Sequence, residues 1–211
     1  MIARLALVAV LVMTGCSTQT VNYSFDPAIL DSHLSTLDSL DSWKIRGRLS
    51  VRTDKGGHIG RIAWARSGTN HQIDIYGGLG SGHIRIVANP REAVLTDSDG
   101  WMSVGDNAQS VLDNYLGWRF PVTEMESWIL GKAYPYSSVE QKWVTLGHVV
   151  EIEQEGWQVV FSQYDTFDGY DLPTRYRFFA SDDLQQEMAE QRPQAEVPKE
   201  IRLVISSWTL N

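Results

Sequence analysis

The sequence of 211 residues contains a single cysteine, Cys16, so an intrachain disulfide is excluded and packing must stabilise the fold. Long apolar runs are also absent: the apolar stretch at residues 5–13 is far shorter than the roughly 20 residues that a membrane-spanning helix needs. Basic residues are scarce, with 18 Lys and Arg against 26 Asp and Glu and a net charge of -8. Such an acidic chain lacks the electrostatic footprint of a nucleic-acid-binding protein, and we expect no nucleic-acid partner.

Patterns that carry catalysis or metal binding are missing as well. The five histidines are scattered without metal-ligand spacing, so neither a metal nor a cofactor is predicted. The glycine-rich segment 77–82 lacks the lysine of a phosphate-binding loop, and Ser81 does not have the spacing of a nucleophile elbow. Asp97-Ser98-Asp99-Gly100 resembles part of a calcium loop but lacks its distal glutamate, which favours a hairpin turn. The sequence therefore indicates a protein that is not an enzyme.

The N-terminus has the layout of a secretory signal, with Arg4 followed by the apolar stretch and small residues. Met13-Thr14-Gly15-Cys16 comes next and resembles the lipobox of bacterial lipoproteins. That resemblance implies that residues 1–15 are a cleaved signal peptide and that the thiol of Cys16 is acylated. Residues 16–25 are polar or lack a pattern and are expected to form a lipidated tether. The alternative is an ordinary secretory signal followed by a free cysteine.

Apolar periodicity predicts mainly strands after one helix. The helix is expected to begin near Asp26 and Pro27, because apolar residues follow at spacings of three and four. The period then becomes two, as where Leu49 and Val51 share a face. Further strands are expected around residues 59–66, 72–75, 83–87, 93–95, 149–153, 157–161, 174–179 and 201–208. Sequential short strands of this kind predict one domain over residues 26–211, built on a curved antiparallel sheet or barrel.

Two helices are expected to interrupt the strands. One begins at residues 106–109 and ends at Gly117; the other begins with the capping box Thr123-Glu124-Met125-Glu126 and ends at Gly131. Residues 182–199 are polar and contain two prolines, so we expect an extended connection or a long hairpin loop there.

Two features leave alternatives open. Eight tryptophans fit either an ordinary packed core or a lipid-sized apolar cavity, and composition does not choose between them. Leu79 stands alone among glycines, which supply no side chains to shield it from water. It either folds back into the core or forms an exposed apolar finger that dips into a membrane or a partner.

The order of short motifs along the chain resembles the LolB family of outer-membrane lipoprotein receptors. After the lipobox and the first helix come Arg46-Gly47-Arg48-Leu49, Ile62-Ala63-Trp64, Gly78-Leu79-Gly80-Ser81 and Trp128-Ile129-Leu130-Gly131. The order continues with Gly156-Trp157-Gln158-Val159, Leu172-Pro173 and Ile201-Arg202-Leu203. The resemblance covers essentially the whole mature chain.

The resemblance implies a half-open antiparallel β-barrel that helices close around an apolar cavity for acyl chains. It assigns membrane insertion to Leu79, although this chain has Gly78 where the family usually has proline. Together with the alternation of the strands, it indicates a cavity wall of twelve residues: Leu49, Val51, Ile62, Trp64, Ile73, Ile75, Ile84, Ile86, Trp128, Val159, Phe178 and Leu203.

The resemblance also implies partners and a location. The expected partners are a periplasmic LolA-like carrier, the acyl chains of lipoproteins and the outer membrane, in which the lipid on Cys16 anchors the protein facing the periplasm. Ser17 in place of aspartate is compatible with that location. We expect a monomer. Two alternatives are a structural or assembly lipoprotein with a solid core, and a lipid-active hydrolase in which a serine, a histidine and an acid converge.

Overall fold

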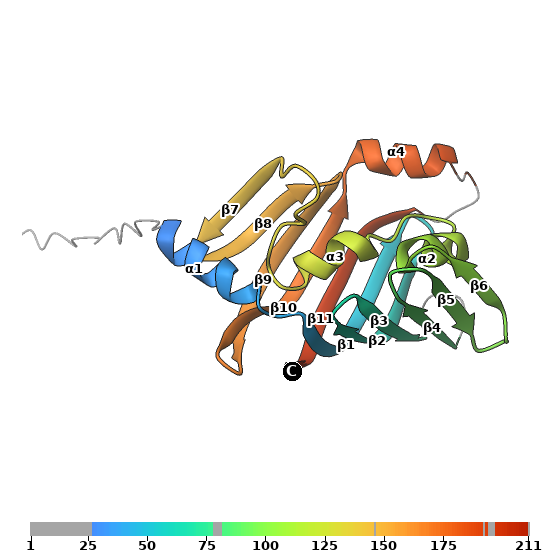
Figure 1. The fold of residues 1–211 in the computed structure, drawn as a ribbon. Coiled ribbons are helices and arrows are strands. Elements are labelled where there is room, and N and C mark those ends of the chain that lie inside the picture. Colours follow the sequence, from blue (N-terminus) through green and yellow to red (C-terminus); the bar gives the residue numbers. More distant parts are fainter. Residues whose placement is uncertain (1–26, 78–81, 146, 192, 194–196, 211) are drawn as a thin grey trace, which may run out of the picture.

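Eleven strands in the described part of the chain form one open antiparallel sheet (Figure 1). The computed structural model describes residues 27–77, 82–145, 147–191, 193 and 197–210. The strand order is β6-β5-β4-β3-β2-β1-β11-β10-β9-β8-β7, so β11 lies beside β1 in the middle of the sheet. This arrangement confirms the expected mainly β fold with a curved, half-open antiparallel sheet and a few helices.

The elements have the following bounds. The strands are β1 Ser42–Thr53, β2 Gly57–Ser67, β3 Asn70–Tyr76, β4 His83–Ala88, β5 Ala93–Asp97, β6 Met102–Gly105, β7 Gln141–Thr145, β8 His148–Gln154, β9 Trp157–Phe167, β10 Tyr170–Ala180 and β11 Pro198–Leu210. The helices are α1 Pro27–Leu37, α2 Ala108–Leu116, α3 Val122–Trp128 and α4 Asp182–Gln191.

The register places alternate residues of the central strands on opposite faces of the sheet. Leu49 of β1 pairs with Leu203 of β11, and both are buried. Their neighbours Arg48 and Val204 also pair, but these side chains are exposed on the other face. A two-residue alternation in sequence thus becomes one buried face and one solvent-facing face.

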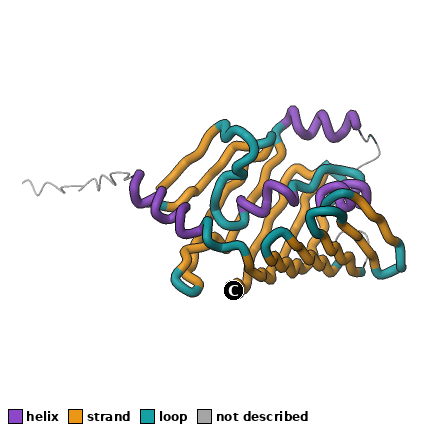
Figure 2. The backbone as a smooth tube through the Cα atoms, in the orientation of Figure 1, coloured by secondary structure: helices purple, strands orange, loops and turns teal. Residues whose placement is uncertain are grey.

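The helices lie along the buried face, as the ribbon and the tube show (Figures 1 and 2). Helix α2 begins at an Asn107 N-cap that forms a capping box with Ser110 and ends at Gly117, whose φ of 80° suits glycine. The capping box predicted at Thr123 is wrong. Helix α3 begins one residue earlier, with Pro121 as its N-cap and no side-chain cap.

Three elements differ from the sequence predictions. Residues 182–199 do not form only a loop, because α4 occupies the first half of the segment. Its Leu184 and Met188 are one helical turn apart and buried, and Asp182 and Asp183 lie in the first turn, where carboxylates are favourable. Strands β6 and β7 were not predicted; both are short edge strands, and the side chains of Met102 and Val104 on β6 are exposed.

Candidate functional site

The predicted wall residues form rows across the helix-covered face of the sheet. Trp64, Ile73 and Ile86 pair in register across β2, β3 and β4. Ile62, Ile75 and Ile84 form a parallel row on the same strands, and the remaining pairs are Leu49 with Leu203 and Phe178 with Val159. Val51 follows two residues after Leu49 on the same face. Trp128 of α3 faces the sheet, with its ring centroid 6.1 Å from that of Phe178.

All twelve predicted wall residues are buried, each with 3% or less of its surface exposed. They belong to one apolar cluster that also contains residues the sequence analysis did not select, notably Trp43, Ile45 and Tyr176. The alternation also includes these three: Ile45 and Trp43 lie four and six residues before Leu49 on β1, and Tyr176 lies two residues before Phe178 on β10. Continuing the alternation along β1 and β10 would have found them.

A chain of hydrogen bonds joins this face to α3 through His71. The indole nitrogen of Trp64 donates to Nδ1 of His71 at 3.2 Å, and Nε2 of the same ring lies 3.2 Å from Oε1 of Glu126. Burial, followed by the positive charge of Arg66, lowers the pKa of His71 to about 4. The imidazole is therefore neutral at pH 7 and donates its Nε2 proton to Glu126, so the contact is a hydrogen bond and not an ion pair.

An open hollow of about 370 Å³ lies where α2 and α3 meet the β2–β3 end of the sheet. Its lining combines His71 and Glu126 with the apolar residues Ala108 and Val122 and with the ring of Tyr136. Burial raises the pKa of Glu126 to about 6. Polar side chains thus lie at this border of the buried face. The sequence did not indicate this role for His71, because its five histidines are scattered.

The hairpin between β3 and β4 carries Leu79, but residues 78–81 lie outside the described residues, as does Cys16. The described stem is firmly held: Gly77 N donates to Gly82 O at 2.9 Å, and the rings of Tyr76 and His83 stack at 4.4 Å. Below the stack, Asp74 accepts hydrogen bonds from Gln72, His83 and Arg85, at 2.7 to 2.9 Å. The hydrogen bonds of Gln72, Arg85 and His83 hold the pKa of Asp74 below its ordinary value despite burial.

Within the described part of the chain, no group of three or more His, Cys, Asp or Glu side chains is arranged to hold a metal ion. No described helix is long and apolar enough to cross a membrane.

Residues 41–208 match the protein family described as Outer membrane lipoprotein LolB. This range includes strands β1–β10, β11 as far as Trp208, and helices α2, α3 and α4. The chain belongs to the LolB family. As a member it is an outer-membrane lipoprotein with a role in lipoprotein localisation.

Relatives in the LolB family span most of the chain. The Outer-membrane lipoprotein LolB of Pseudomonas syringae pv. syringae is 32% identical over 177 residues, which cover 81% of this chain and 85% of that protein. The LolB of Pseudomonas fluorescens is 29% identical over 174 residues, with the same coverage. A crystal structure of a DUF1329 family protein from Desulfovibrio piger shares the fold, with a TM-score of 0.51 at 11% identity over 88% of this chain and 92% of that chain.

Proposed function

We propose that this LolB-family chain accepts lipoproteins from a periplasmic LolA-like carrier by binding their acyl chains, and inserts them into the outer membrane. The observation that carries the proposal is the continuous apolar face of β1–β4 and β9–β11 beneath α2 and α3. Cross-strand rows such as Trp64, Ile73 and Ile86 offer hydrocarbon contact along the length of an acyl chain. Membership of the LolB family supplies the context of lipoprotein localisation.

The energetics need no nucleotide. Each methylene of an acyl chain that is exposed to water costs about 0.8 kcal/mol relative to an apolar environment. The chain therefore passes from one apolar environment to another. Affinity that rises from the carrier to the receptor and then to the bilayer is enough to drive the transfer. For this transfer the receptor needs an apolar face that can be uncovered. Helix α3 covers part of that face and is joined to it partly by the hydrogen bonds of His71.

The hollow beside α3 is the proposed site at which acyl chains enter. Its polar lining residues, His71 and Glu126, bridge the sheet and α3 at the border of the apolar cluster. An acyl chain inserted there would separate α3 from β3 and contact Trp64 and Ile73. Leu79 then completes the transfer of the lipoprotein by entering the bilayer, while the lipid on Cys16 keeps the protein at the destination membrane.

Acceptance can be tested with a fluorescently labelled lipoprotein bound to its carrier. The wild-type protein should remove the lipoprotein from the carrier, and an apolar fluorescent probe bound to the receptor should be displaced as this happens. Retention of the lipoprotein on the carrier, together with no probe binding, would contradict the acyl-chain role and favour a structural or assembly lipoprotein.

Insertion is tested separately with Leu79→Glu. The variant should accept the lipoprotein from the carrier as the wild type does but deliver it poorly to vesicles, because a carboxylate is costly to place in hydrocarbon. Val139→Glu, which makes the same kind of change in the loop that precedes β7, is the control and should deliver normally. Equal delivery by wild type and Leu79→Glu would show that Leu79 is not the inserting residue.

A further inference from the structure

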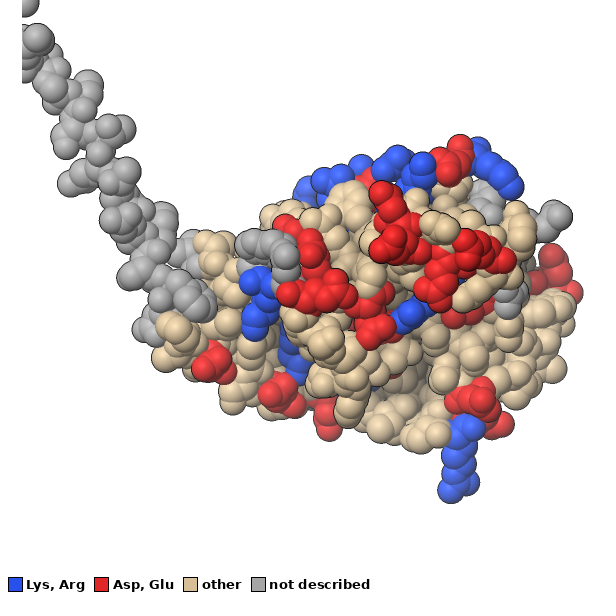
Figure 3. All heavy atoms as spheres, turned by 90° about the horizontal axis from the view of Figure 1, so that it is seen from above, with Lys and Arg blue, Asp and Glu red and all other residues tan. Residues whose placement is uncertain are grey.

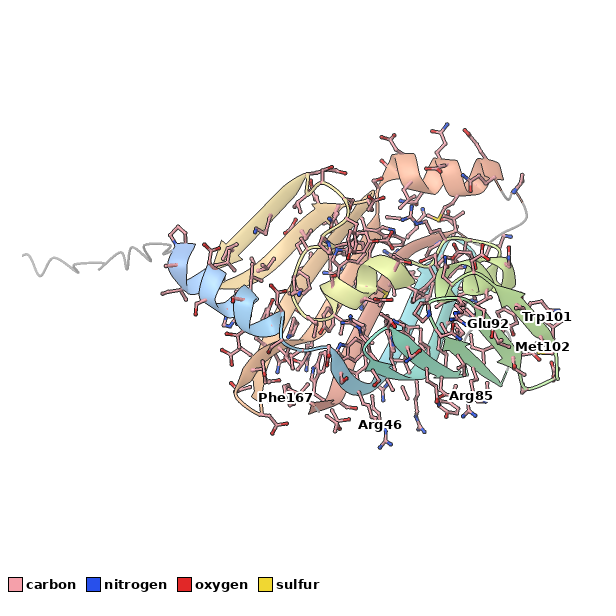
Figure 4. The ribbon with its side chains drawn as sticks, in the orientation of Figure 1. Arg46, Arg85, Glu92, Trp101, Met102 and Phe167 are labelled. Carbon is pink, nitrogen blue, oxygen red and sulfur yellow. The ribbon has the colours of Figure 1, made fainter. Side chains whose placement is uncertain are left out.

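Four cations gather on the face of the sheet opposite the helices. Lys44, Arg46 and Arg48 alternate along β1 with buried residues, and Arg61 lies beside them on β2. We call these four residues the β1–β2 cationic surface. Figure 4 shows Arg46, together with Arg85 of β4, projecting from the sheet away from the helices.

Within the described part of the chain these four cations have no acidic partner, unlike other cations on the same face. Glu200 of β11 accepts hydrogen bonds from Arg52, Arg177 and Arg202, and Asp74 pairs with Arg85. Among the residues that the structure describes, no carboxylate lies within ion-pair distance of any member of the β1–β2 cationic surface. The positive charge there is therefore not neutralised within the described protein.

The arrangement is unfavourable for the isolated protein. Arg48 and Arg61 are direct cross-strand partners, and like charges in that position destabilise a sheet. The chain as a whole is acidic, with a net charge of -8, and carboxylates from Glu140 to Glu187 line a separate hollow beside α4. Figure 3 shows acidic side chains over the face seen from above, while Lys and Arg side chains follow one border of it. An external anion would relieve the repulsion within the cationic surface.

The shape of the surface fits phosphate groups next to hydrocarbon. Lys44, Arg46 and Arg61 line an open hollow of about 860 Å³, together with Asp74, whose carboxylate is paired with Arg85. Strand β11 contributes the hydroxyl-bearing residues Ser206, Ser207 and Thr209. Cations and hydroxyl groups are the usual ligands of phosphate oxygens. Apolar side chains stand beside them on the same face: Ile59 is 67% exposed, Tyr76 44% and Val204 42%. Exposed apolar groups interspersed with cations are typical of a surface that lies on a membrane.

We propose that the β1–β2 cationic surface binds the phosphate groups of anionic phospholipids and so lays the outer face of the sheet on the bilayer. Tyr76 and His83, which flank residues 78–81, belong to the same face through their pairing with Arg61 and with each other. Docking in this way would bring the hairpin that carries Leu79 to the membrane and direct the acidic residues near α4 away from it. The inference requires only that the protein works at a membrane surface, and it does not depend on binding of acyl chains.

The test measures binding to vesicles without carrier or cargo. Residues 16–211 with Cys16→Ala keep every described element and carry no lipid, so only the folded surface can bind. This protein should sediment with vesicles of phosphatidylcholine and phosphatidylglycerol but not with pure phosphatidylcholine, and added salt should release it. Because one basic residue near an anionic membrane contributes about fivefold to binding, Arg61→Glu should weaken binding about 25-fold.

Controls separate this effect from misfolding and from total charge. Arg61→Glu replaces a repulsive cross-strand pair with an attractive one, so its thermal unfolding temperature should not fall. Lys142→Glu makes an equal charge change on β7, outside the surface, and should bind as the parent does. Equal binding to neutral and anionic vesicles, or normal binding by Arg61→Glu, would overturn the proposal. So would a variant that binds vesicles normally but no longer binds the carrier protein, since the surface would then be a protein-docking site.

Discussion

The indole nitrogen of Trp128 in α3 donates a hydrogen bond of 2.9 Å to the side-chain carbonyl of Gln154 at the end of β8, and both residues are fully buried. The same oxygen accepts from Tyr134 N at 2.9 Å, while the amide nitrogen of Gln154 donates to the carbonyl oxygens of Tyr134 and Ser137. One amide therefore joins α3, the loop that follows it and the sheet, at the edge of the apolar cluster.

Gln154→Ala should destabilise the protein by about 3 kcal/mol, because the substitution leaves several buried donors and acceptors unpaired. Chemical denaturation in urea, followed by tryptophan fluorescence, measures the change. Gln186→Ala is the control: the exposed side chain of Gln186 on α4 donates to Glu190, so the loss should stay within about 0.5 kcal/mol. Similar losses for the two variants would show that Gln154 does not organise this region.

Glu200 should make the protein sensitive to acid. Its three arginine partners, of which Arg202 has the largest effect, lower the pKa of Glu200 from 4.5 to about 2. A carboxyl with a lowered folded-state pKa contributes stability above pH 4.5 and loses it as the pH falls from 4.5 towards 2. Glu200→Gln should therefore cost about 2 kcal/mol at pH 7, and the difference from wild type should shrink through that range.

Thermal unfolding at a series of pH values measures the contribution of Glu200. Glu92→Gln removes an exposed carboxylate on the β4–β5 turn and serves as the control, with little effect at pH 7. A Glu200→Gln variant as stable as wild type at pH 7 would show that the arginines do not need this charge.

His71 should also reduce stability in acid, as Glu200 does, but over the higher range between pH 6.5 and 4. Because the folded state lowers its pKa to about 4, the unfolded chain binds the proton more readily in this range, and stability falls as the pH falls from 6.5 to 4. Glu126 partly offsets this effect, since its raised pKa lets the folded state take up a proton between pH 4.5 and 6. The positive charge of Arg66 near the imidazole lowers the pKa of His71 further.

The variant His71→Gln should flatten the pH dependence of the unfolding temperature below pH 6.5, and Glu126→Gln should steepen it. NMR titration of the His71 ring provides a direct reading, with the neutral form persisting below pH 5. A His71 that becomes charged near pH 6.5 would show that the ring is not buried against Glu126 in solution.

Gly60 should control the position of the hairpin stem. A Cβ atom at this residue would lie 2.6 Å from Gly77 O and 3.0 Å from Tyr76 O, so Gly60→Ala must displace the end of β3. The expected cost is about 1–3 kcal/mol, with reduced delivery of lipoprotein to vesicles. Gly57→Ala on the same strand meets its nearest atom at an ordinary 3.5 Å and should change neither stability nor delivery. Normal delivery by Gly60→Ala would show that the position of the hairpin stem does not affect insertion of the lipoprotein.

The sequence predicted the sheet well because burial on one face leaves a period of two in the chain. Leu49, Ile73 and Phe178 were placed on the buried face by that period together with the family resemblance. It failed where the period is weak or local: β6 exposes Met102 and Val104, and α4 buries only Leu184 and Met188 in an otherwise polar segment. The capping box assigned to Thr123 satisfied a sequence rule, but the helix begins earlier, at Val122.

The polar features of the site could not be read from the sequence in the same way. His71 and Glu126 are 55 positions apart, and only the packing of α3 on β3 brings them within 3.2 Å. The β1–β2 cationic surface likewise depends on the register that sets Arg48 opposite Arg61. Alternation tells which face a side chain occupies, whereas its neighbours on that face depend on strand pairing.

The central position of β11 in the sheet also determines when the chain can complete its folding. Strands β1–β6 and β7–β10 form two ladders that meet only when β11 inserts between β1 and β10, about 150 residues after β1 is made. Until then both ladders present a long unpaired edge, which invites aggregation and proteolysis. A chain cut short before β11 thus has no route to the native sheet, and its two ladders stay separate and open to proteases.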